Sequence, residues 1–275
     1  MTDNNPLKQY FRRPALYLKL PSGGHGYPAG AIDLPDNGEL PVYPMTAIDE
    51  ITSRTPDALY NGTAVVEIIR SCIPSIKDPW AVTSIDLDPL LVAIKIATNG
   101  NKMEVDTNCP KCDEDSKYDL DLSRILAGFK SADYATPLRI GDLLIKFRPL
   151  SYTELNAVNE SQFQAQRMII ELTAITDEKE RNHKSSQALL AMNDIAIDVM
   201  SKVIESITTP TAVVNDRNFV LDFLRNCDAR TFDTIKDKNV ELRQASETKP
   251  LHFSCPHCSN EYDQPFTVNM TNFFD

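Results

Sequence analysis

Residues 108–113 have the sequence NCPKCD, and residues 254–259 have the sequence SCPHCS. Each motif holds two cysteines with a two-residue spacer, which lets both thiolates of one turn face the same tetrahedral ion. Two such turns supply four ligands, the number that a structural zinc site requires. The sequence therefore predicts one structural zinc ion, bound by Cys109, Cys112, Cys255 and Cys258.

Residues 113–254 separate Cys112 from Cys255, whereas a continuous zinc ribbon has only roughly 15 to 20 residues between its cysteine pairs. A shared ion thus requires the long intervening region to be an insertion between two halves of a ribbon that meet in space. Because four protein ligands leave no coordination position for water, a catalytic zinc is not expected.

Other interpretations of the cysteines stay open. A thioredoxin-like redox role needs CxxC at the start of a helix after a strand, a context that neither motif has. A cytoplasmic setting disfavours disulfides, and two unrelated reduced pairs are a further alternative. His252 and His257 flank the second motif and could each replace a ligand, but four cysteines make this unnecessary. Cys72 and Cys227 lie in helical apolar patterns and are predicted core residues.

Composition and charge restrict the class of protein. The chain has 275 residues, a formal net charge of -11 and no run of 18 apolar residues, so we expect neither a membrane span nor a secretory signal. We expect synthesis in a cytoplasm. Nucleic acids and anionic lipids bind through lysine and arginine, so the acidic balance argues against both as partners.

Four segments follow from the distribution of residue types. Residues 1–45 hold seven of the 18 prolines and five of the nine glycines, which predicts an extended arm rather than regular structure. Large side chains in this arm predict docking on another protein. The anchors proposed for this docking are Tyr10, Phe11, Tyr17, Leu18, Leu20, Tyr27 and Tyr43.

Residues 46–150 are predicted to combine helices with the first cysteine motif and a hairpin. Thr46 with Asp49 caps one short helix, and apolar spacing predicts two more, at about 63–72 and 86–99. Short strands are expected on both sides of the first motif. A hairpin is expected at 138–147, with its turn at Gly141.

Residues 151–246 are predicted to be a helical bundle, and 247–275 to hold the second motif and a C-terminal strand. Ser151 with Glu154 forms a capping box, and a long helix is expected to carry a broad apolar face into the core. That face comprises Leu189, Met192, Ala196, Val199, Val203 and Ile207, widened by Leu190, Ile195, Ile197, Met200 and Ile204. Shorter helices are expected at 216–226 and 230–246. The predicted class is α+β, mainly helical, with a small β zinc ribbon built from two distant knuckles and an extended N-terminal arm.

No enzyme signature is found. The chain has no GxSxG, HExxH, GxxxxGK[ST] or GxGxxG motif, and the acidic stretches lack the glycine and the spacing of a calcium-binding loop. We therefore expect no catalytic residues, no organic cofactor and no small-molecule substrate.

A series of short motifs carries a family resemblance. In order along the chain they are LKLPSG (18–23), VYPMTAIDE (42–50), IIRSCI (68–73), DLDPLLVAIKIATNG (86–100), CPKC (109–112) and LDL (120–122). Over roughly residues 16–175 this order resembles the baseplate hub subunit and hub assembly proteins of T-even-type contractile phages. The second cysteine motif fits that pattern less closely.

The resemblance implies a non-catalytic structural protein of the virion tail baseplate, whose partners are other baseplate and tail proteins. It equally permits a hub assembly factor or chaperone that is absent from the mature virion. A zinc-ribbon nucleic-acid-binding accessory protein is the third hypothesis, favoured by the cysteine motifs and opposed by the charge.

Overall fold

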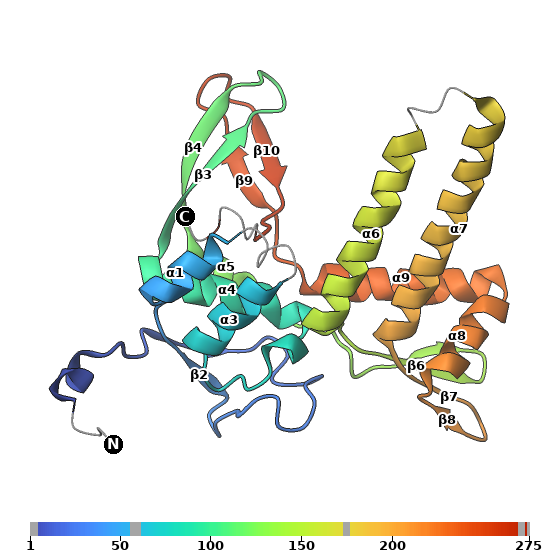
Figure 1. The fold of residues 1–275 in the computed structure, drawn as a ribbon, viewed down its shortest axis with the longest axis horizontal. Coiled ribbons are helices and arrows are strands. Elements are labelled where there is room, and N and C mark those ends of the chain that lie inside the picture. Colours follow the sequence, from blue (N-terminus) through green and yellow to red (C-terminus); the bar gives the residue numbers. More distant parts are fainter. Residues whose placement is uncertain (1–4, 56–61, 173–176, 269–272, 274–275) are drawn as a thin grey trace. The chain divides into compact units, whose positions relative to one another are not determined.

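The structure, a computed structural model, describes residues 5–55, 62–172, 177–268 and 273. The chain divides into two units, residues 1–131 together with 247–275, and residues 132–246. Helices and small antiparallel sheets make up both units (Figure 1), which confirms the predicted α+β class. None of the helices in these ranges is long and apolar enough to cross a bilayer. The finer four-part division of the chain stays a prediction.

The first unit has a helical core. It contains α1 (Ala47–Ser53), α3 (Thr63–Cys72), the 3-10 turn η2 (Pro79–Ala81), α4 (Ser84–Asn99) and α5 (Leu122–Gly128). Helix α1 begins at the predicted N-cap Thr46, which forms a capping box with Asp49, and α4 ends where predicted, at Gly100. The largest fully buried side chains of these helices are Ile68, Ile69, Leu90, Leu91, Ile94 and Leu122.

The proline-rich N-terminal segment takes part in this core. After the 3-10 turn η1 (Pro6–Tyr10), strand β1 (Leu16–Lys19) pairs antiparallel with β2 (Glu39–Val42). Leu18, Leu40 and Val42 are buried because alternate positions of the two strands face the helices, and Leu20, which follows β1, is buried as well. Leu18 and Leu20 are therefore packed within the chain and are not free to anchor a partner, a correction to the sequence-based expectation.

A buried carboxylate fixes the loop that follows β1. The carboxylate of Asp86, near the start of α4, accepts hydrogen bonds from the backbone N–H and hydroxyl of Ser22, the hydroxyl of Tyr27 and the hydroxyl of Thr83. Burial raises the pKa of Asp86, and these hydrogen bonds oppose that rise by stabilising the anion. The loop is thereby attached to the helical core by polar contacts that nothing in the local sequence indicates.

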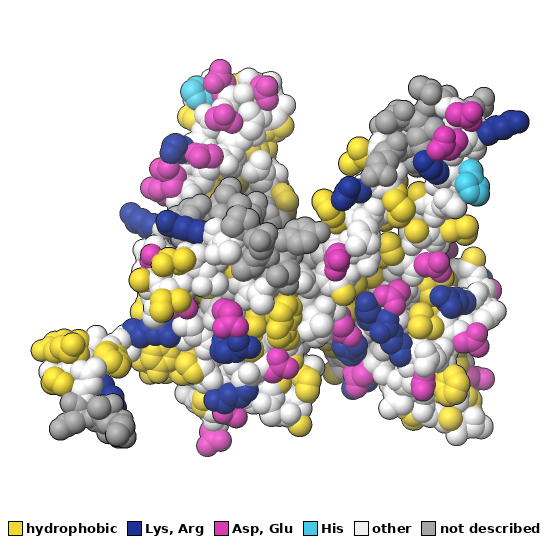
Figure 2. All heavy atoms as spheres, in the orientation of Figure 1, with side chains coloured by type: hydrophobic (Ala, Val, Ile, Leu, Met, Phe, Trp, Pro, Cys, Tyr) yellow, Lys and Arg dark blue, Asp and Glu magenta, His cyan; other side chains and the backbone are white. Residues whose placement is uncertain are grey.

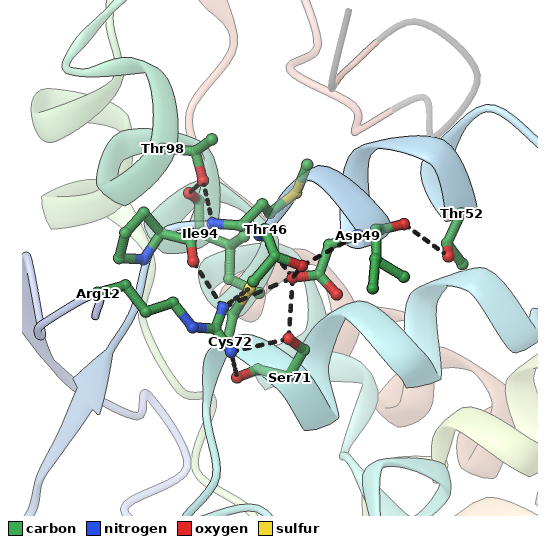
Figure 3. A network of polar contacts seen from close by, with 11 residues as sticks. Arg12, Thr46, Asp49, Thr52, Ser71, Cys72, Ile94 and Thr98 are labelled. Atoms are coloured by element: carbon green, nitrogen blue, oxygen red, sulfur yellow. Dashed lines mark hydrogen bonds and ion pairs between the residues drawn. The ribbon is translucent and has the colours of Figure 1, made fainter. Parts of the chain in front are cut away.

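A second polar network attaches the chain just after η1. The guanidinium of Arg12 donates to the Pro44 carbonyl at 2.7 Å and to the carbonyl and hydroxyl of Ser71 at 2.7 and 2.9 Å (Figure 3). It also lies 3.5 Å from the carboxylate of Asp49, which accepts from Ser71 and from the backbone N–H of Thr46. One arginine thus joins the N-terminal segment, the cap of α1 and the end of α3.

The second unit combines a four-stranded antiparallel sheet with four helices. The sheet has the order β5 (Leu138–Ile140), β6 (Leu143–Phe147), β7 (Ile204–Thr208) and β8 (Val213–Val214). The helices are α6 (Tyr152–Leu172), α7 (Glu178–Val203), α8 (Arg217–Asn226) and α9 (Ala229–Ser246). The predicted β5–β6 hairpin turns at Gly141, whose φ of 57° suits glycine, and the predicted Ser151–Glu154 capping box is present.

Two expectations for α7 were wrong. The helix ends at Val203, and Ile204 and Ile207 belong to β7, because this segment pairs with β6 instead of continuing the helical period. Leu189 and Met192 are exposed rather than buried, since among the described residues the apolar face of α7 has no covering element at this level. Met200 and Val203, nearer the sheet, do enter the core with Phe147 and Leu224.

The two ends of the second unit lie together. The backbone N–H of Ala132, where the unit begins, donates to the hydroxyl of Ser246, where it ends, at 3.2 Å. An insertion whose ends are adjacent can interrupt a host fold without pulling its two halves apart.

The buried leucines generate a prediction about truncation. Deleting residues 1–11 should leave the melting temperature nearly unchanged, because Arg12 and the β1–β2 hairpin stay in place. Deleting residues 1–22 should lower the free energy of unfolding by about 3 kcal/mol or more, because Leu18, Leu20 and the Arg12 contacts are lost. Chemical denaturation of both proteins checks this, and equal stability would show that the hairpin is not part of the core.

Asp88 on α4 generates a prediction about pH. Burial raises the pKa of its carboxyl to about 6, so the folded state holds a proton that the unfolded state loses near pH 4. Ionisation of Asp88 therefore lowers the free energy of unfolding progressively as the pH rises from about 4 to 6, and this loss persists above pH 6. We expect Asp88→Asn to raise the free energy of unfolding by about 1–3 kcal/mol at neutral pH and to have little effect near pH 4.

Urea denaturation at both pH values measures this change. Asp36→Asn, in an exposed turn, is the control and should change neither value. A destabilised Asp88→Asn protein at neutral pH would contradict the prediction.

Candidate metal centre

Each cysteine motif forms the loop of a β-hairpin. Strands β3 (Lys102–Asn108) and β4 (Asp115–Asp121) pair over their full length, and their loop carries the first motif. Strands β9 (Leu251–Ser254) and β10 (Glu261–Gln264) pair likewise, and their loop carries the second. Both loops have six residues, and the predicted strands around the first motif are confirmed. The two hairpins lie side by side in the first unit (Figure 1).

The two loops share one backbone geometry. In the first, the N–H of Cys109 donates to the Glu114 carbonyl and the N–H of Asp113 to the Cys109 carbonyl. In the second, the N–H groups of Cys255 and Ser259 make the equivalent bonds, to the carbonyls of Asn260 and Cys255. The residue after the second cysteine has a positive φ in both loops, 61° at Asp113 and 56° at Ser259. Each loop therefore presents its two sulfurs in the same way.

The structure brings all four predicted cysteines together. The sulfur atoms lie within 4.8 Å of one another, with Cys109 Sγ 3.7 Å from Cys258 Sγ and Cys112 Sγ 3.6 Å from Cys255 Sγ. Sulfurs at the corners of a tetrahedron, each about 2.3 Å from a central zinc-sized ion, are about 3.8 Å apart. The distances Cys109–Cys258 and Cys112–Cys255 match this spacing, and every other sulfur–sulfur distance is at most 4.8 Å. Cys109 and Cys255 are buried, and Cys112 and Cys258 are half-buried.

The pKa values of two thiols in the cluster are shifted in opposite directions. Burial opposes ionisation of Cys109, but hydrogen bonds from the backbone of Cys112 and Lys111 outweigh it and lower the pKa of the thiol to about 6. The backbone N–H of Glu114 favours a thiolate at Cys112, but burial and the neighbouring sulfurs raise its pKa to about 12. Four adjacent thiolates repel one another, so a cation is required to ionise the whole set.

Aromatic packing joins the two hairpins independently of a metal. The ring centroid of Tyr118 on β4 lies 4.7 Å from that of Phe253 on β9, and the Phe253 and Tyr262 centroids are 5.8 Å apart. The Tyr118 hydroxyl donates to the Ser254 carbonyl at 3.0 Å, and the hydroxyls of Thr107 and Tyr262 share a hydrogen bond. Sequence reasoning did not identify these residues. In the sequence they are marked only by aromatic or hydroxyl side chains at alternate positions of the strands.

The remaining cysteines and histidines lie outside the cluster. His252 Nδ1 is 2.8 Å from the carboxylate of Asp263, and among the described residues the four cysteines alone form a group of metal-ligating side chains. Cys72 is buried, as predicted, with its sulfur 3.9 Å from the Arg12 guanidinium. Cys227 is only half-buried and ends α8.

The outer surface of the hairpins is acidic. Asp113, Glu114 and Asp115 are exposed at the first loop, and carboxylates are prominent on this part of the surface (Figure 2). Residues 102–121 contain three lysines and seven carboxylates. Four thiolates around a divalent ion would add further negative charge to this region.

The fold and the cluster together define an α+β protein in which cysteines from two distant hairpins could hold a structural metal ion. A model of the family described as T4 bacteriophage base plate protein matches residues 31–275. The chain belongs to this family and is a phage baseplate protein. Its partners are therefore other tail and baseplate proteins, and its location is the virion tail. No curated protein and no solved structure matches the chain.

Proposed function

We propose that the protein is a structural subunit of the hub of a contractile tail baseplate and acts through protein–protein contacts without catalysis. The match of residues 31–275 to the baseplate family carries this proposal. The order of motifs at 18–23, 42–50, 68–73 and 86–100 supports the hub in particular, since it resembles hub proteins. These motifs form β1, the α1 cap, the end of α3 and α4, so they describe one packed body.

We further propose that Cys109, Cys112, Cys255 and Cys258 bind one structural zinc ion. Four sulfur ligands select zinc over hard cations such as magnesium and calcium, and they leave no position for a reacting water. A thioredoxin-like role is disfavoured because both CxxC motifs lie in hairpin loops rather than at helix starts. The ion would join the two halves of the first unit, which are far apart in sequence.

We expect the N-terminal anchoring role to fall on the exposed side chains of residues 7–17. Leu7, Tyr10, Phe11 and Tyr17 are exposed, Tyr10 by 78% and Tyr17 by 63%, whereas Leu18 and Leu20 are packed inside. Exposed aromatic side chains supply much of the affinity in protein interfaces. This segment is thus a candidate contact with a neighbouring subunit.

The zinc proposal predicts one zinc ion per chain. Because metal binding joins the two hairpins, Cys109→Ser and Cys258→Ser should both lose the ion and lower the melting temperature by a similar amount, about 5–15 °C. Elemental analysis and thermal unfolding measure the two effects. Cys227→Ser, the matched control, should keep the zinc. Purified protein without zinc, or a large difference between the two variants, would exclude a shared ion.

The hub proposal predicts a fixed copy number in the finished particle. Quantitative mass spectrometry of purified virions should find the protein in constant ratio to known tail proteins, and chemical cross-linking should join it to subunits at the tail axis. If the protein is abundant in infected cells but missing from virions, it is the assembly factor instead. A host cytoplasmic protein is the control for contamination.

The acidic surface around the cysteine loops argues against the nucleic-acid-binding alternative. The acidic hairpin described above repels phosphate, and binding to nucleic acid relies on neutralising it. A gel-shift assay at low salt separates the two hypotheses, since a non-specific binder would retard nucleic acid there.

A further inference from the structure

The two cysteine loops are arranged with an approximate two-fold symmetry. The first cysteine of each loop lies close to the second cysteine of the other, at sulfur–sulfur distances of 3.7 and 3.6 Å. In each loop the N–H of the first cysteine donates to the carbonyl of the residue two positions after the second cysteine. That residue is Glu114 in the first loop and Asn260 in the second, so these two residues hold equivalent positions in the backbone.

The side chains at the two equivalent positions differ in burial and in chemistry. Asn260 is half-buried, and its amide Nδ2 is a hydrogen-bond donor 4.0 Å from Cys109 Sγ, an atom of the other hairpin. Glu114 is exposed, and an ionised carboxylate can only accept hydrogen bonds. Glu114 therefore cannot supply the matching donor toward Cys255.

A donor directed at Cys109 has a physical effect once a metal ion is bound. Four thiolates around a divalent cation leave two net negative charges, and N–H groups that point at the sulfurs stabilise this charge. The backbone of Lys111 and Cys112 donates to Cys109 from within its own loop, whereas Asn260 reaches the same sulfur from the other loop. The contact of Asn260 thus exists only while the two hairpins are together.

We propose that Asn260 is a positioning residue of the metal centre. Its amide donates to the thiolate of Cys109, holds that sulfur in its coordinating position and couples the second hairpin to a ligand of the first. Outer partners of metal ligands typically contribute about 10–100-fold to affinity. Asn260 therefore determines how tightly the ion is held and leaves the number of sulfur ligands unchanged. This inference rests on the proposed zinc site.

Competition for zinc between the full-length protein and a colour-forming chelator of known zinc affinity tests the role of Asn260. Asn260→Ala should weaken zinc binding by about 10–100-fold. Asn260→Asp, which has the same shape but brings a carboxylate toward the thiolate, should weaken it at least as much. Glu114→Ala is the matched control at the equivalent position of the other loop, and it should bind zinc at least as tightly as wild type.

Two further measurements separate positioning from ligation and from a purely structural role. Titration with cobalt(II), whose thiolate bonds absorb light, should give the same final spectrum for wild type and Asn260→Ala, because all four cysteines still bind. The melting temperatures of the metal-free proteins should agree, whereas the zinc-loaded variant should melt lower than zinc-loaded wild type at limiting zinc.

The outcomes distinguish this inference from the zinc proposal itself. Wild-type protein that binds no zinc refutes the metal site, and the role of Asn260 with it. Wild-type protein that binds one zinc ion no more tightly than Asn260→Ala refutes the positioning role alone. Equal weakening by Glu114→Ala, or equal destabilisation of the metal-free and zinc-loaded Asn260→Ala protein, also overturns it.

Discussion

Two β-hairpins from distant parts of the chain bring four sulfur atoms within 4.8 Å of one another, and the rest of the architecture has to be compatible with this closure. Residues 113–254 lie between the two cysteine pairs, and most of them form α5 or the second unit. The second unit begins and ends at the hydrogen bond between Ala132 and Ser246. It can therefore leave and re-enter the first unit at one place, and its own sheet and helices need no contribution from the hairpins to complete their core.

The contact between the two hairpins does not depend on the sulfur atoms alone. Tyr118 of the first hairpin packs against Phe253 of the second, so an aromatic contact joins the two hairpins independently of the sulfur atoms. A contact of this kind matters because four thiolates without a cation would repel one another. Arg12 and Asp86 have a comparable role at the N-terminal segment. Each supplies several hydrogen bonds from one buried or half-buried group, and together they hold proline- and glycine-rich chain against the helices.

Apart from the cysteine cluster, the features that the sequence predicted depend on residues close together in the chain. The capping boxes at Thr46 and Ser151 depend on residues three positions apart, and the hairpin turn at Gly141 depends on one glycine, so each is visible without knowledge of the fold. The four cysteines were predicted because two thiolate pairs imply a common ion. Ile207 was misassigned because helical period cannot reveal that β6 offers a pairing partner. The Arg12 and Asp86 contacts join residues about 60 positions apart, for which no sequence pattern exists.

The same reasoning explains why the apolar face of α7 was expected in the core. A period of three to four residues shows that one side of a helix is apolar, but it does not show whether the covering surface belongs to the same chain. The exposed apolar side chains and the cysteine cluster lie in different chemical surroundings. The cysteine loops are surrounded by carboxylates, whereas Leu189 lies in an uncharged run, and Tyr10 and Phe11 stand near Arg12 and Arg13. In a chain of net charge -11, association with another acidic protein is least opposed where carboxylates are few. We therefore infer that the cysteine cluster joins the two hairpins within the first unit. Contacts with other subunits form instead at the exposed apolar surfaces away from this cluster.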